Sequence, residues 1–112
     1  MTIEELKEFG VNTDEGLSRC LNNEEFYFRM IRLAASDTGF NKLKDAVENH
    51  DLATAFEAAH ALKGVLGNLS ITPLFVPLSE ITELLREKKD MDYSVYLEEI
   101  ERKKEALKKL CR

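Results

Sequence analysis

Residues 52–70, LATAFEAAHALKGVLGNLS, contain the pattern that decides the fold. Apolar side chains recur there at alternating intervals of three and four residues, at Leu52, Ala55, Ala59, Leu62, Leu66 and Leu69. That spacing places one apolar stripe along a helix, and such a stripe is typical of helices that pack in a bundle. We therefore expect a helix over about 52–69, with the Asp51 side chain as its N-cap.

The rest of the chain has the same helical periodicity, and strand signals are almost absent. Further helices are predicted at about 2–9, 14–21, 24–36, 40–48, 72–88 and 93–110. Thr72 is the expected N-cap of the helix over 72–88, and Pro77 inside it predicts a bend or a late start. The sequence thus predicts an all-α protein: an antiparallel four-helix bundle with short additional N-terminal helices, as a single domain over residues 1–112.

Two of the predicted helices have apolar faces that we expect to be buried. In the helix over 24–36 this face consists of Phe26, Tyr27, Met30, Ile31, Leu33 and Ala34. In the helix over 93–110 it consists of Tyr96, Leu97, Ile100, Leu107 and Leu110. The charges of the last helix alternate in sign on the opposite face, which is usual for a solvated surface.

The composition excludes several functional classes. The 112 residues are 44% hydrophobic and carry a net charge of −5, so a nucleic acid is not the expected partner. No apolar run approaches the ~20 residues of a membrane span, and the acidic start does not resemble a signal peptide. Cys20 and Cys111 have neither metal-site nor disulfide-framework spacing, which favours a reducing, cytoplasmic setting.

His60 lies about 130° around the predicted helix from the centre of the apolar stripe, so its side chain should face solvent. Its neighbours on that face are Phe56, Lys63, Gly64 and Gly67. Each glycine inside a helix costs roughly 1 kcal/mol relative to alanine. Because both glycines share the face of the histidine, they leave bare backbone that another molecule can approach closely.

This group of side chains suits phosphoryl transfer. A histidine side chain is largely neutral at pH 7, so a ring nitrogen can attack phosphorus in line. The ammonium of Lys63 can stabilise the charge on the transferring group. The chain has no Gly-rich loop or Mg²⁺ site, so a partner must supply the metal and the leaving carboxylate. Taken singly, a surface histidine or a helical glycine more often has only a packing role; their combination on one face favours the chemistry.

Residues 59–64, AHALKG, resemble the H-x-L-K-G signature of histidine phosphotransfer (HPt) domains. Asp51, Gly67 and the upstream segments 16–19 and 22–27 also fit that family, and the resemblance covers roughly residues 12–90. It implies a helical bundle whose exposed histidine relays a phosphoryl group between receiver-domain aspartates. By this resemblance His60 accepts the group on Nε2, and Lys63 lies near the phosphate.

The resemblance also implies the partners. Phe56, Gly64 and Gly67 are expected to contact the docked partner, with Gly64 as the glycine that permits docking. The partners would be receiver domains of response regulators, and a hybrid histidine kinase is a further candidate. The protein would be a monomeric phosphoryl carrier without kinase activity or a cofactor of its own, and Mg²⁺ would be held by the receiver.

Two positions depart from the family pattern. Ser70 stands where a glycine is common, ten residues after the histidine, and Thr82 stands where a Gln or Glu often orients the imidazole. Glu80 or Glu83 would take over that role if the helix were rotated or bent at Pro77. Thr82 also keeps open a second function, that of a non-phosphorylated helical adaptor for receivers or a kinase. A third is the phosphorylatable domain of a larger kinase.

Three other residues are weaker candidates. His50 follows a helix end, where its charge suits the helix dipole, and a His50–His60 metal pair lacks ligand spacing. Phe75 and Val76 would either join a docking surface or pack in the core.

Overall fold

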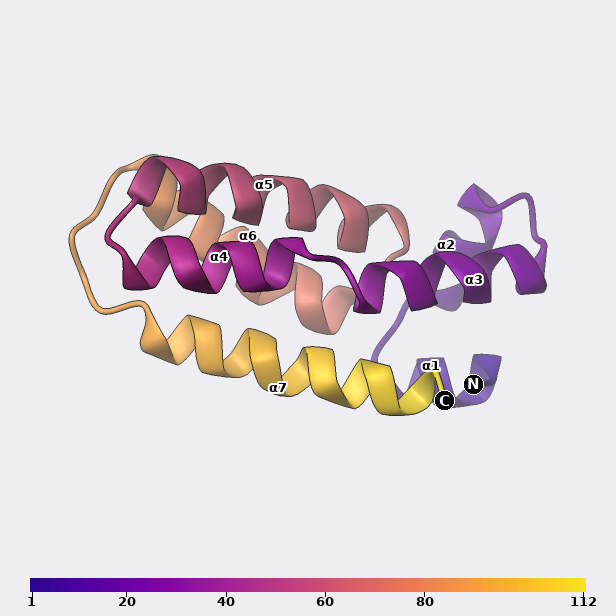
Figure 1. Cartoon of the computed structure of the whole chain (residues 1–112). Coiled ribbons are helices and arrows are strands. Elements are labelled where there is room, and N and C mark those ends of the chain that lie inside the picture. Colours follow the sequence, from indigo (N-terminus) through magenta and orange to yellow (C-terminus); the bar gives the residue numbers. More distant parts are fainter.

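The computed structural model describes residues 1–112 and contains seven helices and no strand. The helices are α1 Ile3–Phe9, α2 Thr13–Arg19, α3 Glu24–Ala35, α4 Gly39–Glu48, α5 Leu52–Asn68, α6 Thr72–Arg86 and α7 Ser94–Leu110. Helices α3 and α4 lie end to end and form one rod of an antiparallel bundle, and α5, α6 and α7 form the other three (Figure 1). The predicted all-α four-helix bundle is therefore confirmed, with its first rod in two pieces.

The break between α3 and α4 falls between the helices predicted over 24–36 and 40–48. The Asp37 carboxylate accepts a hydrogen bond from the Gly39 amide at 2.7 Å. A Cβ at position 39 would lie only 3.1 Å from the Leu62 side chain of α5. The glycine thus lets the start of α4 pack closely against the middle of α5.

The start of α5 follows the sequence prediction, and the start of α6 does not. Asp51 accepts a hydrogen bond from the Thr54 amide at 3.1 Å, and hydrogen bonding from Thr54 lowers the pKa of the Asp51 carboxyl. In α6 the N-cap is Ile71, so the assignment of Thr72 as the cap was wrong by one residue. Of the two outcomes predicted from Pro77, a bend or a late start, the late start was wrong, because this buried proline lies inside a helix that begins at Thr72.

One cluster of 24 buried hydrophobic residues forms the core, from Leu6 in α1 to Leu107 in α7. The apolar stripe of α5 lies in it as predicted: Ala55, Ala59, Leu62 and Leu66 are at most 1% exposed. Leu69 is buried as well, and Leu52 is half-buried. The periodicity of this one helix therefore fixed its orientation in the bundle.

The prediction of a wide buried face on α3 was wrong in part. Tyr27, Ile31 and Ala34 are buried, but Phe26 is 36% and Leu33 61% exposed. The buried residues share one side of α3, whereas Phe26 and Leu33, seven residues apart, lie together on another side, at about 100° per residue.

Helix α7 buries Ile100 and Leu107 as predicted and half-buries Tyr96, Leu97 and Leu110. It also buries one charged residue, Lys104, which is 7% exposed. The Lys104 ammonium lies 2.8 Å from Glu101 and 5.6 Å from the centre of the Phe40 ring.

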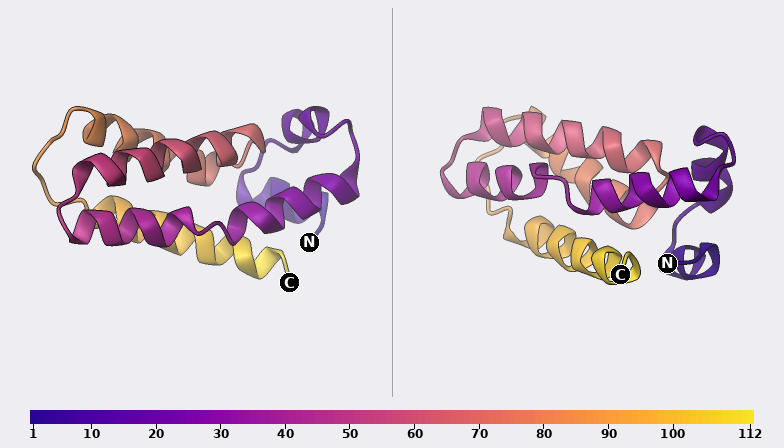
Figure 2. Two further views of the ribbon diagram at one scale, coloured as in Figure 1. Left: turned by 45° about the horizontal axis from the view of Figure 1, so that its top comes forward. Right: turned by 45° about the vertical axis from the view of Figure 1, so that its right-hand side comes forward.

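Helices α1 and α2 lie at one end of the bundle, near both chain termini (Figures 1 and 2). They are tied to the loop after α5, because the Asn12 amide donates to the Ser70 carbonyl at 3.0 Å. None of the seven helices has both the length and the apolar composition needed to cross a membrane.

Candidate functional site

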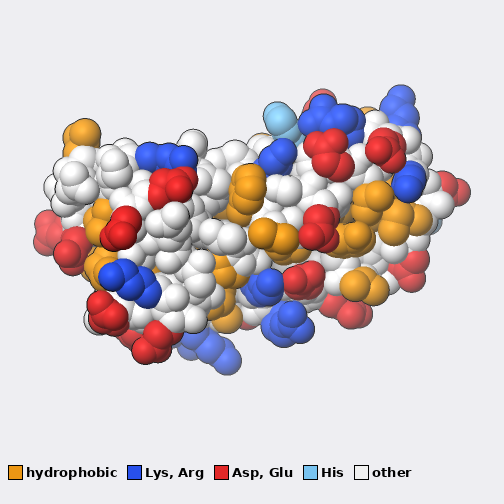
Figure 3. Space-filling view, turned by 180° about the vertical axis from the view of Figure 1, so that it is seen from behind, with side chains coloured by type: hydrophobic (Ala, Val, Ile, Leu, Met, Phe, Trp, Pro, Cys, Tyr) orange, Lys and Arg blue, Asp and Glu red, His pale blue; other side chains and the backbone are white.

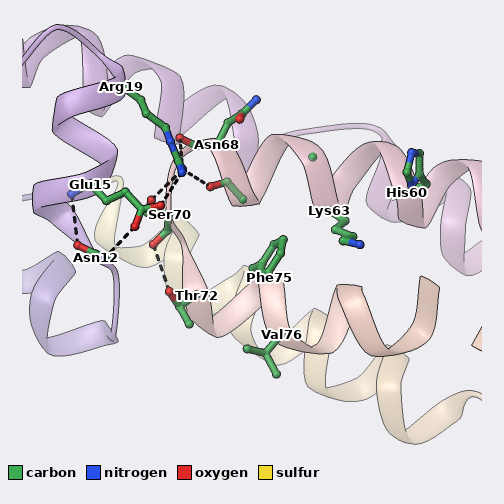
Figure 4. Close-up of a pocket in the computed structure, with 12 residues that line it drawn as sticks. Asn12, Glu15, Arg19, His60, Lys63, Asn68, Ser70, Thr72, Phe75 and Val76 are labelled. Carbon is green, nitrogen blue, oxygen red and sulfur yellow. Dashed lines mark hydrogen bonds and ion pairs between the residues drawn. The ribbon is translucent and has the colours of Figure 1, made fainter. Parts of the chain in front are cut away.

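His60 projects from the outer face of α5 and is exposed, as the sequence predicted. It lies at one end of an open groove of about 670 Å³ (Figure 4). Lys63 and Gly64 continue the groove along α5, Phe75 and Val76 of α6 line it, and Arg19 of α2 lines its far end. The structure thus brings His60, Lys63, Gly64 and Gly67 to one concave surface.

The imidazole of His60 stacks on a phenyl ring of its own helix. Its ring centre lies 5.7 Å from that of Phe56, one helical turn earlier, and the two ring planes differ by 16°. The guanidinium carbon of Arg86 lies 5.0 Å from the centre of the same phenyl ring. No side chain donates a hydrogen bond to the imidazole or accepts one from it.

The position expected to orient the imidazole is occupied by a side chain that cannot reach it. Thr82 is fully buried, and its hydroxyl donates a hydrogen bond to the Leu78 carbonyl at 2.6 Å. Glu83 pairs with Arg86 at 3.3 Å, and Glu80 is exposed without an ion pair. Neither glutamate takes over the orienting role that Thr82 leaves vacant.

Lys63 forms no ion pair within the chain, whereas six other lysines and arginines pair with acidic residues. Its stem is half-buried along α5 and its ammonium borders the groove (Figure 4). The positive charge is therefore available to an anionic group that enters the groove.

The two glycines on the histidine face have different surroundings. A Cβ at Gly64 would meet nothing within 4 Å, whereas a Cβ at Gly67 would lie 2.9 Å from the Phe75 ring. Gly64 is therefore an open patch of backbone, and Gly67 allows α6 to pack closely against α5. The sequence could not separate these roles, because the residue that contacts Gly67 comes from another helix.

Arg19 is a site residue that sequence reasoning missed. Its guanidinium donates to the carbonyls of Gly67 at 2.8 Å and Asn68 at 3.4 Å, and to the Ser70 hydroxyl at 3.2 Å (Figure 4). Glu15 pairs with it at 2.6 Å. Arg19 thus adds side-chain hydrogen bonds to the carbonyls at the end of α5, where its positive charge also interacts favourably with the helix dipole.

The same contact explains the departure at Ser70. Its φ is 58°, in the left-handed region that glycine adopts most easily, which accounts for a glycine being common there. In this chain the residue at position 70 is a serine, and its hydroxyl accepts a hydrogen bond from Arg19 that a glycine could not form.

The weaker candidates have ordinary surroundings. His50 is exposed just after the end of α4, and no group of three or more His, Cys, Asp or Glu side chains could hold a metal ion. Phe75 is half-buried, and Val76 is 46% exposed at the groove.

Cys20 is buried, Cys111 is half-buried, and neither forms a disulfide. Burial raises the pKa of the Cys111 thiol.

The surface charge is mixed in sign. On the face seen from behind, Lys and Arg side chains alternate with Asp and Glu, and hydrophobic groups lie between them (Figure 3). No continuous basic surface is visible on this face.

The family comparison agrees with this geometry. The model of the Hpt domain family matches residues 31–111, which include His60 and all of α4 to α7. No curated protein and no solved structure matches the chain. Hpt domains take part in histidine phosphotransfer in two-component systems, where they interact with receiver domains and kinases. Because the match covers well over half of the chain and includes the exposed histidine, this protein belongs to the Hpt domain family.

Proposed function

We propose that this protein relays a phosphoryl group between receiver-domain aspartates, with His60 as the acceptor. The observation that carries the proposal is the exposed imidazole of His60, flanked by the unpaired ammonium of Lys63 and the open backbone of Gly64. A nucleophile, a free cation and room for a second active site are what the transfer requires.

The transfer is a displacement at phosphorus. A neutral imidazole nitrogen of His60, which we assign as Nε2, attacks the phosphorus of an aspartyl phosphate. The new P–N bond forms as the P–O bond to the aspartate breaks, and the carboxylate leaves with the bonding electrons. The proton on the other ring nitrogen stays in place, so no base is needed. The reverse displacement passes the group to a second receiver.

Lys63 acts on the charge of the transferring group. Negative charge spreads over three phosphoryl oxygens in the transition state, and an ammonium at the groove stabilises it. Mg²⁺ bound by the receiver would neutralise the charge on the donor side. The chain's own contribution is therefore the nucleophile, one cation and the docking surface.

Phe56, Gly64 and Gly67 are the proposed docking residues. The space over Gly64 lets the rim of a receiver's active site approach α5 without meeting a side chain. Phe56 and Gly67 lie on either side of it along the same helix.

We also propose that the protein works as a monomer in the cytoplasm. The unpaired thiols of Cys20 and Cys111 support a reducing compartment.

Transfer from phosphorylated receivers tests the main proposal. Receivers carrying labelled phosphate are mixed with the protein, and the modified residue is mapped. We expect an acid-labile phosphate on His60, no labelling of His60→Gln, and normal labelling of the matched control His50→Gln. Undiminished labelling of His60→Gln would refute the assignment.

The adaptor function remains a second candidate because no hydrogen bond tethers the imidazole. An adaptor would bind receivers with equal affinity before and after His60→Gln and would never acquire label. Binding measured alongside labelling separates the two functions.

A further inference from the structure

We propose that Phe56, which is in contact with Arg86, is the positioning residue that orients the imidazole of His60 for attack on phosphorus. The inference rests on the proposed function, since it concerns the geometry of the same acceptor. In this chain, a stacked ring would do what a hydrogen-bonding side chain of the next helix does elsewhere.

The first observation is the stacking itself. The near-parallel rings of Phe56 and His60, with centres 5.7 Å apart, have the geometry of an offset aromatic stack. The two residues are four apart on α5, so the helix itself brings them together. Phe56 is partly buried against the core, so it offers the exposed imidazole a fixed surface.

The second observation is the contact between Arg86 of α6 and the Phe56 ring. The guanidinium of Arg86 lies over the Phe56 ring at 5.0 Å, within cation–π range. Glu83 holds the Arg86 Nε at 3.3 Å, one turn earlier on α6. Helix α6 therefore reaches the imidazole through a sequence of contacts, from Glu83 to Arg86 to Phe56 to His60.

The third observation is that nothing else fixes the ring. Thr82 is buried and bonded to its own helix, so α6 cannot present a hydrogen-bonding group from that position. A stack restricts the ring through its face and leaves both nitrogens unbonded within the chain. The attacking lone pair is then free, while the rotational freedom of the side chain is reduced before the partner arrives.

The stack can be measured in the unphosphorylated protein. Imidazole proton and nitrogen resonances of His60 are recorded by NMR, with His50 as an internal reference. The Phe56 ring current should displace the His60 ring protons, and Phe56→Leu should return them toward the values of His50. Phe56→Tyr should preserve the displacement. Identical His60 shifts in wild type and Phe56→Leu would overturn the inference.

The rate of phosphorylation by phosphoramidate tests the function of the stack. In this reaction the imidazole displaces ammonia from phosphorus: one P–N bond forms as the other breaks. The donor is small, so docking plays no part and only the presentation of the imidazole matters. We expect Phe56→Leu to slow the reaction by about 3- to 10-fold, Arg86→Gln by about 2- to 3-fold, and Phe56→Tyr to restore the wild-type rate.

The chain provides a matched control. Arg29 lies over the Phe26 ring at 5.7 Å, which is the same kind of pair without a histidine. Phe26→Leu and Arg29→Gln should leave the phosphoramidate rate unchanged. Urea unfolding of every variant shows which remain folded, and Arg86→Gln changes only a half-exposed side chain if Phe56→Leu proves unstable.

The outcomes separate this inference from the proposed function. If wild type is labelled and Phe56→Leu and Arg86→Gln react at the wild-type rate, the positioning role is refuted while the function stands. If wild type takes up no phosphate from receivers or phosphoramidate, the function fails and the positioning role fails with it, whatever the NMR shifts show. Slowing by Phe56→Leu with rescue by Phe56→Tyr supports both.

Discussion

Gly67 of α5 faces the ring of Phe75 of α6 so closely that a Cβ at position 67 would lie 2.9 Å from it. Gly64, one turn earlier on the same helix, has nothing within 4 Å of the equivalent point. The two glycines therefore have different reasons to lack a side chain: Gly67 makes room for the packing of Phe75, and Gly64 leaves the surface of α5 accessible.

Alanine at each position should separate these constraints. Gly67→Ala forces the Phe75 ring to move and should lower the free energy of unfolding by about 1–3 kcal/mol. Gly64→Ala meets no obstacle and should raise it by up to about 1 kcal/mol, because alanine is the better helix former. Urea unfolding of both variants measures the difference. Equal effects of the two substitutions would contradict the assignment of Gly67 to packing.

Tyr27 should make stability depend on pH in the alkaline range. Its buried hydroxyl donates to the Leu69 carbonyl at 2.8 Å, and burial raises its pKa to about 12. In the unfolded chain the phenol titrates near its ordinary value of about 10. The folded state thus keeps its full stability below pH ~10 and loses part of it as the pH rises toward 12.

The comparison with Tyr27→Phe isolates this effect. The variant should be less stable by about 1–2 kcal/mol at pH 7, because the Leu69 carbonyl loses its side-chain donor. Its stability should then fall less than that of wild type between pH 10 and 12. Denaturant unfolding at a series of pH values measures both, and parallel curves for the two proteins would argue against a buried, titrating Tyr27.

Lys104 should contribute to stability more than its neighbour Lys103. The Lys104 stem is buried and its ammonium lies over Phe40, whereas Lys103 is more exposed and pairs with Glu99 at 2.9 Å. Lys104→Ala should cost about 1–2 kcal/mol through lost packing, and Lys103→Ala about 0.5 kcal/mol or less. Thermal unfolding of the two variants checks the order; a larger loss for Lys103→Ala would show that the buried stem contributes little.

Lys63 should affect the chemistry and leave the fold unchanged. Because it has no ion pair in the chain, Lys63→Ala should slow phosphoryl transfer by about 10-fold with no significant change in melting temperature. Lys63→Arg, which retains the positive charge, is the control and should keep most of the rate. A fall in melting temperature that matches the loss of rate would make Lys63 a structural residue instead.

Patterns within single helices were enough to predict much of this molecule. The stripe of α5 and the cap at Asp51 depend on residues a few positions apart, so the sequence predicted the helix, its orientation and the exposure of His60. The H-x-L-K-G motif lies within one such helix, which is why the candidate acceptor could be identified.

The features that could not be predicted join distant parts of the chain. The contact of Arg19 with Ser70 spans 51 residues, and the stacking of Arg86 on Phe56 links two helices. Each of these contacts depends on tertiary packing, which the periodicity of a single helix cannot predict.

The hydrogen bonds from Arg19 and Tyr27 to the end of α5 both originate before residue 31, outside the region that the Hpt family model matches. A protein trimmed to residues 31–111 would therefore lose the side-chain donors to the Gly67, Asn68 and Leu69 carbonyls at the end of the histidine-bearing helix. Without these hydrogen bonds the far end of the groove would be less rigid, so a groove studied in the shorter fragment would differ from that of the 112-residue chain.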